Sequence, residues 1–195
     1  IINNIKKLHP GELIEINLDD NITLNKHRYW SPNNFIDSKQ FDEKKFLDLL
    51  IDSYSIRSKA DVEISNLLSG GIDSTALIKI NELSKNRSTQ NTFSVSIKDS
   101  EYDESFWFNQ VVEKYKTNHK TEILPKNISL DIVNDSINLF DEPYADPSTV
   151  PSYIIYKTIS NYYKVAISGD GGDELLGGYT RIYNSINRKK LNENI

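Results

Sequence analysis

Residues 67–78 read LLSGGIDSTALI, in which an apolar stretch runs into a two-glycine turn and then a helix-like pattern. A turn between a strand and a helix exposes backbone N–H groups that lack a partner inside the helix, and these groups and the helix dipole attract anions. Gly70 and Gly71 let phosphate oxygens approach without a Cβ in the way. The hydroxyls of Ser69 and Ser74 add donors. The stretch therefore has the chemistry of a phosphate-binding loop.

Asp73 places a carboxylate at the centre of this loop. A carboxylate repels phosphate unless a cation lies between them, and Mg²⁺ bridging carboxylate and phosphate oxygens is the ordinary solution. The lysine of the Walker A pattern, G-x-x-x-x-G-K-[ST], is missing, so the chemistry of a P-loop NTPase is disfavoured. A simpler alternative remains, in which SGG ends a strand and Asp73 or Ser74 caps the helix.

A second glycine-rich turn, SGDGGDELLGGY at 168–179, carries Asp170, Asp173 and Glu174. Acidic side chains crowded into such a turn indicate a metal site or a proton-transfer site. The spacing is not that of an EF-hand, which needs acidic residues at alternate positions. The alternative is a helix N-terminus in which Asp173 and Glu174 complement the helix dipole.

The rest of the chain predicts the elements that position these turns. ELIEINL and NITLNKHRYW predict a β-hairpin within residues 1–30, followed by a loop and a boundary near 31–38. TFSVSI alternates in a way that predicts a strand with one apolar face. Strands are predicted at 62–68, 92–97, 120–124 and 164–168, and helices at 41–57, 72–85, 104–117, 128–140 and 149–162. This alternation predicts an α/β fold with a mainly parallel sheet, and both glycine-rich turns follow strand ends, where ligands collect.

Composition excludes several classes of protein. The net charge of −5 disfavours a binder of nucleic-acid backbones, and no apolar run is long enough to span a membrane. No signal peptide is recognisable at the start. The absence of cysteine removes disulfides and thiolate metal sites and fits a cytoplasmic protein. The absence of methionine leads us to expect a piece of a longer chain, and His9, His27 and His119 lack partners at metal-ligand spacing.

The two motifs together resemble a known family. LLSGGIDSTALI resembles the pyrophosphate-binding loop (S-G-G-x-D-S) of the ATP pyrophosphatases, and SGDGGDELLGGY resembles the signature of glutamine-hydrolysing asparagine synthetases. TFSVSIKDSEYDES (92–105) and DEPYADPSTVPSY (141–153) resemble intervening segments of that family, in the same order. The resemblance implies a Rossmann-like fold of the adenine nucleotide α-hydrolase type, with helices on both faces of the sheet.

The resemblance implies an ATP-dependent synthetase with ATP and Mg²⁺ as cofactors. A substrate carboxylate, with aspartate as the first expectation, attacks the α-phosphorus of ATP to give an acyl-adenylate and pyrophosphate. Ammonia released from glutamine in a missing glutaminase half then displaces AMP to form the amide. Neither nucleic acid nor a membrane is an expected partner, and a homodimer of the full-length parent stays open.

Site residues carry over only where this sequence matches the motifs. The resemblance assigns the pyrophosphate end to Ser69, Gly70, Gly71, Asp73 and Ser74. It assigns contacts with adenosine, largely through the backbone, to Leu67, Val95, Ser168 and Gly169. Asp73 and Asp173 would bind Mg²⁺, and Asp170 holds an acidic position implicated in the acyl-adenylate and amide-forming steps. Glu142 and Asp146 would shape the pocket for the acceptor.

The resemblance also divides the chain into two parts and shows which family residues this sequence lacks. IKKLHPGELIEI followed by RYW (28–30) resembles the end of the glutaminase half, so residues 1–37 are expected to be its remnant and linker, and 38–195 a partial synthetase domain. The cysteine nucleophile of the glutaminase half is absent, and the chain stops before the region in which the family supplies a catalytic lysine.

Alternatives for the activity stay open. An amidotransferase acting on a sugar acid or a lactam precursor would use the same two motifs, and the isolated fragment could be an inactive nucleotide-binding piece. A tRNA-thiolating enzyme would predict cysteines and a basic face, and neither is present.

Overall fold

The computed structural model describes residues 3–18, 22–36, 40–84, 89–98, 100–101, 103–124, 126–141 and 144–185. The chain forms two compact units, Ile1–Glu43 and Lys44–Ile195. The predicted boundary at residues 37 and 38 lies close to this division, but its assignment to a glutaminase remnant and a synthetase domain stays a prediction.

The first unit contains the predicted hairpin. β1 (Glu12–Asn17) pairs antiparallel with β2 (Thr23–Arg28), from Glu12 opposite Arg28 to Asn17 opposite Thr23. Lys26 lies 2.6 Å from the Glu12 carboxylate, and this hydrogen bond lowers the pKa of Glu12. The predicted loop after the hairpin contains one turn of 3₁₀-helix, η1 (Pro32–Phe35), because the fixed φ of proline suits a first helical position.

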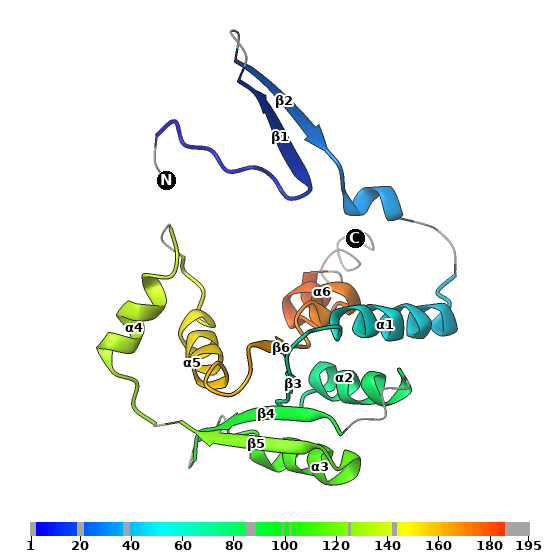
Figure 1. The fold of residues 1–195 in the computed structure, drawn as a ribbon, viewed down its shortest axis with the longest axis vertical. Coiled ribbons are helices and arrows are strands. Elements are labelled where there is room, and N and C mark those ends of the chain that lie inside the picture. Colours follow the sequence, from blue (N-terminus) through cyan, green and yellow to red (C-terminus); the bar gives the residue numbers. More distant parts are fainter. Residues whose placement is uncertain are drawn as a thin grey trace, which may run out of the picture. The chain divides into compact units, whose positions relative to one another are not determined.

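The second unit is built on a parallel sheet of four strands in the order β5-β4-β3-β6 (Figure 1). The strands are β3 (Ile64–Leu67), β4 (Asn91–Ser96), β5 (Asn118–Ile123) and β6 (Val165–Ile167). The predicted α/β fold with a parallel sheet is therefore confirmed. β3 and β6 are neighbours although they lie far apart in the sequence, and this pairing brings the two glycine-rich turns to one edge of the sheet.

Helices connect the strands, and each predicted helix is present. They are α1 (Glu43–Arg57), α2 (Ile72–Leu83), α3 (Ser105–Tyr115), α4 (Leu130–Ile137), α5 (Thr149–Ile159) and α6 (Gly172–Leu176). α4 begins later than predicted because Ser129 caps it, its Oγ accepting from the N–H of Ile132. Over the described ranges, no helix has the length and apolar character needed to cross a membrane.

The helices cover both faces of the sheet. Right-handed crossovers place α2 and α3, which connect β3 to β4 and β4 to β5, on one face of the sheet. The connection from β5 to β6 runs in the opposite direction across the sheet, so its helices, α4 and α5, lie on the other face. The packing agrees: Leu68 forms a buried cluster with Ile78 of α2 and Phe108 of α3. Phe93 of β4 instead meets the ring of Tyr162, just after α5, with centroids 6.0 Å apart.

The central strand β4 departs from the prediction of one apolar face. Thr92, Ser94 and Ser96 alternate with its apolar residues, yet all three are buried. Each hydroxyl has a partner: Thr92 bonds to Thr117 and His119, Ser94 donates to the Leu68 carbonyl, and Ser96 donates to Asp103. Helices cover this face too, and satisfied hydroxyls can be buried at low cost. The strand is therefore enclosed on both sides.

Candidate active site

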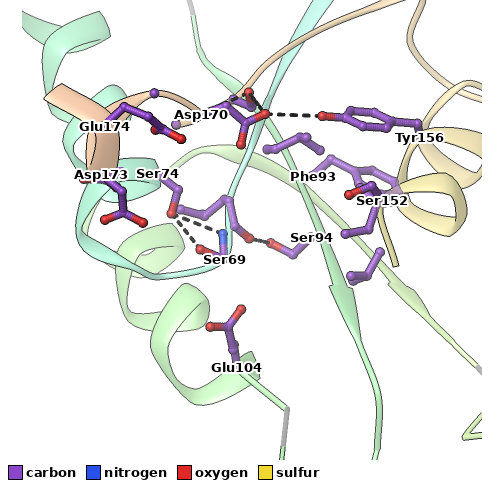
Figure 2. A pocket seen from close by; sticks show the side chains of 18 of the residues that line it. Ser69, Ser74, Phe93, Ser94, Glu104, Ser152, Tyr156, Asp170, Asp173 and Glu174 are labelled. Atoms are coloured by element: carbon purple, nitrogen blue, oxygen red, sulfur yellow. Dashed lines mark hydrogen bonds between the residues drawn. The ribbon is translucent and has the colours of Figure 1, made fainter. Parts of the chain in front are cut away.

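A cavity of about 490 Å³ lies beyond the carboxyl ends of β3, β4 and β6 (Figure 2). The chain continues from β3 and from β6 into the two glycine-rich turns, and such a point in a parallel sheet is where ligands bind. Nine of the thirteen residues to which the resemblance assigned a role line this cavity. They are Leu67, Ser69, Asp73, Ser74, Val95, Ser168, Gly169, Asp170 and Asp173.

The two turns are in direct contact. A Cβ placed on Gly169 would lie 3.0 Å from the Cβ of Asp73 and 3.1 Å from the backbone nitrogen of Ser74. The acidic turn therefore lies against the first turn of α2 with no room for a larger residue at this position. This contact joins two motifs that are far apart in the sequence into one site.

The first turn of α2 presents backbone N–H groups, and the serine hydroxyls around it bond within the loop. The N-cap of α2 is Gly71, and Asp73 lies in the first helical turn, so the alternative in which Asp73 or Ser74 is the cap is wrong. The Oγ atoms of Ser69 and Ser74 lie 3.0 Å apart, and the Ser69 N–H donates to Ser74 Oγ at 3.3 Å. These hydrogen bonds link the residue before the two glycines to the first turn of the helix and so stabilise the loop.

Gly70 has a structural part in this loop. Its φ is +84°, and a Cβ there would lie 2.6 Å from both the backbone nitrogen of Phe108 and the Cβ of Trp107. The loop packs directly on the start of α3, which requires glycine. Gly70 and Gly71 are not among the lining residues, and their part in holding pyrophosphate stays a prediction.

The acidic turn leads into the short helix α6. Asp173 and Glu174 lie in its first turn, so the alternative in which they complement the helix dipole also describes their position. The Tyr179 hydroxyl donates to Glu174 at 2.6 Å, and this bond lowers the pKa of Glu174. Asp173 and Glu174 both line the cavity as well, and Figure 2 shows them on the side of Ser74.

Asp170 is held by hydrogen bonds from two side chains. Its Oδ2 accepts from Ser168 Oγ at 2.8 Å and from the Tyr156 hydroxyl at 3.4 Å. Both bonds meet at the same oxygen (Figure 2). Burial and the Asp170 carboxylate raise the pKa of Tyr156, so the phenol keeps its proton near neutral pH.

The lining is strongly acidic. Its charged side chains are the carboxylates of Asp73, Glu104, Asp170, Asp173 and Glu174, and no Lys, Arg or His is among the lining residues. Partial burial raises the pKa of Glu104. An anionic ligand such as a nucleotide can enter this cavity only with a cation that offsets the carboxylates.

The donor set fits a metal that arrives with a phosphate ligand. Within the described part of the chain, no group of three or more His, Cys, Asp or Glu side chains could hold a metal ion by itself. Magnesium, however, is commonly bound by one or two protein carboxylates and completed by phosphate oxygens and water. Asp73 and Asp173 line the same cavity from different turns and meet this description.

Apart from Glu174, which the acidic turn had already pointed to, the remaining lining residues were not nominated from the sequence. Leu68, Phe93 and Ile155 extend the apolar wall beside Leu67 and Val95, and α5 supplies Ser152 and Tyr156. Glu104 had one usable signal, since it stands just before a helix that follows β4. Ser152 lies within the family-like segment 141–153, whereas Tyr156 had no signal, because its approach to Asp170 depends on how α5 packs.

The two residues nominated for the acceptor pocket have different outcomes. Asp146 is not among the lining residues, and its carboxylate accepts from the N–H and the hydroxyl of Ser148 at 2.8 Å and 2.6 Å. Glu142 lies outside the described residues.

Comparison with known sequences identifies the family. The sequence model of the asparagine synthase family matches residues 45–194, which includes both turns and every lining residue of the cavity. The chain belongs to the asparagine synthase family.

Several curated proteins of this family are similar to the chain. A putative glutamine-hydrolysing asparagine synthetase 2 of Methanocaldococcus jannaschii is 30% identical over 183 residues, which cover 92% of this chain and 35% of that protein. Glutamine-hydrolysing asparagine synthetase 1 of Bacillus subtilis is 28% identical over 180 residues, covering 90% of this chain and 28% of that protein. This asparagine synthase family chain thus spans about a third of the length of these relatives.

Among solved structures, an NH₃-dependent NAD synthetase from Campylobacter jejuni is similar, with a TM-score of 0.47 and 15% identity. The similarity covers 72% of this chain and 62% of that one.

Proposed function

We propose that the protein containing this chain uses ATP to form an amide on a small carboxylic acid, with aspartate as the first candidate. The contact between Gly169 and Asp73 supports this most directly, because it unites a phosphate loop and an acidic turn around one cavity. A site for phosphate alone has no use for five carboxylates. A site that holds ATP with Mg²⁺ and activates a second substrate beside it does.

The reaction takes place in two steps. A carboxylate oxygen of the acid attacks the α-phosphorus of ATP, the bond from that phosphorus to the bridging oxygen breaks, and pyrophosphate leaves. Ammonia then attacks the acyl carbon, AMP leaves with the bonding electrons, and the nitrogen loses a proton. The leaving groups are anions, so their release is favoured by groups that stabilise negative charge.

Each side chain has a proposed part in these steps. The first turn of α2, with Ser69 and Ser74, binds the pyrophosphate end, and the adenosine is contacted, largely through the backbone, by Leu67, Val95, Ser168 and Gly169. Asp73 and Asp173 would hold Mg²⁺, which would supply positive charge to offset that of the phosphate groups. Asp170, held by Ser168 and Tyr156, acts on the acyl-adenylate and the incoming nitrogen.

The parts of a longer protein are proposals too. The family match begins at residue 45, which agrees with residues 1–37 being the end of a glutaminase half that delivers ammonia. A homodimer of such a parent and a cytoplasmic location stay predictions.

The test is isotope exchange between ATP and pyrophosphate in the complete natural protein that contains residues 1–195, with a panel of carboxylic acids. Mg²⁺-dependent exchange that requires aspartate would support the proposal, and exchange with another acid would reassign the substrate. Exchange with none of the acids would contradict amide formation through an acyl-adenylate.

The metal ligands are tested by Asp73→Asn and Asp173→Asn, each expected to lower exchange at least about 100-fold, since metal charge stabilisation contributes several kcal/mol. Asp131→Asn is the matched control. Asp131 is the second residue of α4 as Asp73 is of α2, and it lies outside the cavity lining. Full exchange in both test variants would show that the carboxylates do not share a metal.

A further inference from the structure

Tyr156 stands out among the lining residues because it touches a proposed catalytic carboxylate from a separate element. It lies on α5, whereas Asp170 and its other donor, Ser168, lie in the turn after β6. Two donors from two elements therefore meet at Asp170 Oδ2. We propose that Tyr156 is a positioning residue, which fixes the Asp170 carboxylate so that its other oxygen faces the cavity.

The geometry supports a positioning role. A bond from Ser168 alone, two residues away in the same turn, leaves Asp170 free to move with that turn. The Tyr156 bond ties the carboxylate to α5, a helix that packs against α4. Figure 2 shows Oδ2 turned toward Tyr156 and the second carboxylate oxygen turned away from it, toward the interior of the cavity.

A second tyrosine of α5 makes the same kind of bond one turn earlier in the helix. Tyr153 donates to Asp135 of α4 at 3.1 Å, and Lys157 lies 2.9 Å from the Tyr153 hydroxyl. Tyr153 is not among the cavity-lining residues. One helix thus carries two tyrosines that each donate to an aspartate, one in the cavity and one outside it, and the second is a matched control for the first.

The consequence is kinetic, provided that Asp170 acts as proposed above, since this inference rests on the proposed function. Replacing the hydroxyl by hydrogen in Tyr156→Phe keeps the ring in the cavity wall and releases one bond to Asp170. Lost positioning of a reacting group lowers the rate more than it lowers substrate binding. We expect kcat for amide formation to fall about tenfold, with the Kd of ATP and Mg²⁺ within about twofold of wild type.

The experiment measures kcat and the Kd of ATP for the complete protein and for Tyr156→Phe, Tyr153→Phe, Asp170→Asn and the double variant Tyr156→Phe/Asp170→Asn. Tyr153→Phe is expected to match wild type. In the double variant, the Tyr156 change should add less than about twofold to the loss in Asp170→Asn, because one residue acts through the other. An unchanged kcat in Tyr156→Phe, or full additivity of the two changes, would overturn the proposal.

A second measurement separates this inference from the proposed function. The ¹³C resonance of the Tyr156 phenol carbon, assigned by its loss in Tyr156→Phe, should shift in Asp170→Asn, while that of Tyr153 stays in place. If no acid supports exchange but this shift occurs, the proposed function fails and the pairing of Tyr156 with Asp170 stands. If exchange occurs and the Tyr156 resonance is unaffected, the pairing fails alone.

Discussion

Gly70→Ala tests whether the phosphate loop depends on its packing against α3. The residue has φ of +84°, where an L-residue costs about 1 to 2 kcal/mol. The new Cβ would also lie 2.6 Å from the Phe108 nitrogen and from the Trp107 Cβ, neither of which can swing aside. Such overpacking costs about 1 to 3 kcal/mol. We therefore expect Gly70→Ala to lower the free energy of unfolding by about 2 to 5 kcal/mol.

Gly177→Ala measures how much a positive φ alone lowers the free energy of unfolding, without a steric clash. Gly177 has φ of +71°, and a Cβ there would have nothing within 4 Å. Its substitution should cost about 1 to 2 kcal/mol. The difference between the two variants, measured by urea denaturation of the purified protein, is then the steric cost of moving α3 away from the loop. Equal losses within about 0.5 kcal/mol would refute the packing argument, since ordinary surface changes have that size.

Three further predictions concern single side chains. Gly178→Ala would place a Cβ 1.9 Å from Asp173 Oδ1 and displace that carboxylate, so calorimetry should show weaker Mg²⁺-dependent binding of ATP, with Gly177→Ala binding normally. Burial lowers the pKa of His119 below 6.5, so its contribution to unfolding free energy is full above pH 6.5 and is lost as the pH falls toward the lower folded value. His119→Gln should flatten the urea stability profile in that range, and an unchanged slope would exclude His119 as its source. Tyr54→Phe removes the buried bond to Asn66 Oδ1 (2.9 Å) and should cost about 1 to 3 kcal/mol in urea, against less than about 0.5 kcal/mol for Tyr153→Phe.

The elements of the fold could be predicted because their signals are local. The apolar and β-branched residues of β3 and the turn at Gly70 and Gly71 identify strand and helix by spacing alone. The polar face of β4 could not be read correctly in this way. Ser94 can be buried because its hydroxyl donates to the carbonyl of Leu68, just after the neighbouring strand β3, and no pattern within β4 reports that partner.

The residues of the site also fall into those that local sequence signals predict and those that they do not. Asp73 and Asp170 stand in glycine-rich turns at strand ends, so their convergence follows from the rule that parallel strands end at one edge. Tyr156 lies in the middle of a helix, where its spacing predicts only packing. Its role depends on where α5 packs, and that position follows from the packing of α5 against α4 and from the contact of Tyr162 with Phe93.

The pairing of β3 with β6 has a consequence for the order of events during synthesis. Ser69 to Ser74 leave the ribosome first, with a single carboxylate. Gly169 and Asp173 follow about 100 residues later, which takes about 5 to 20 s at usual rates of elongation. Until β6 docks beside β3, the growing chain lacks the second carboxylate and the second wall of the cavity. Competence to hold a metal–nucleotide complex therefore begins late, with the last strand of the sheet.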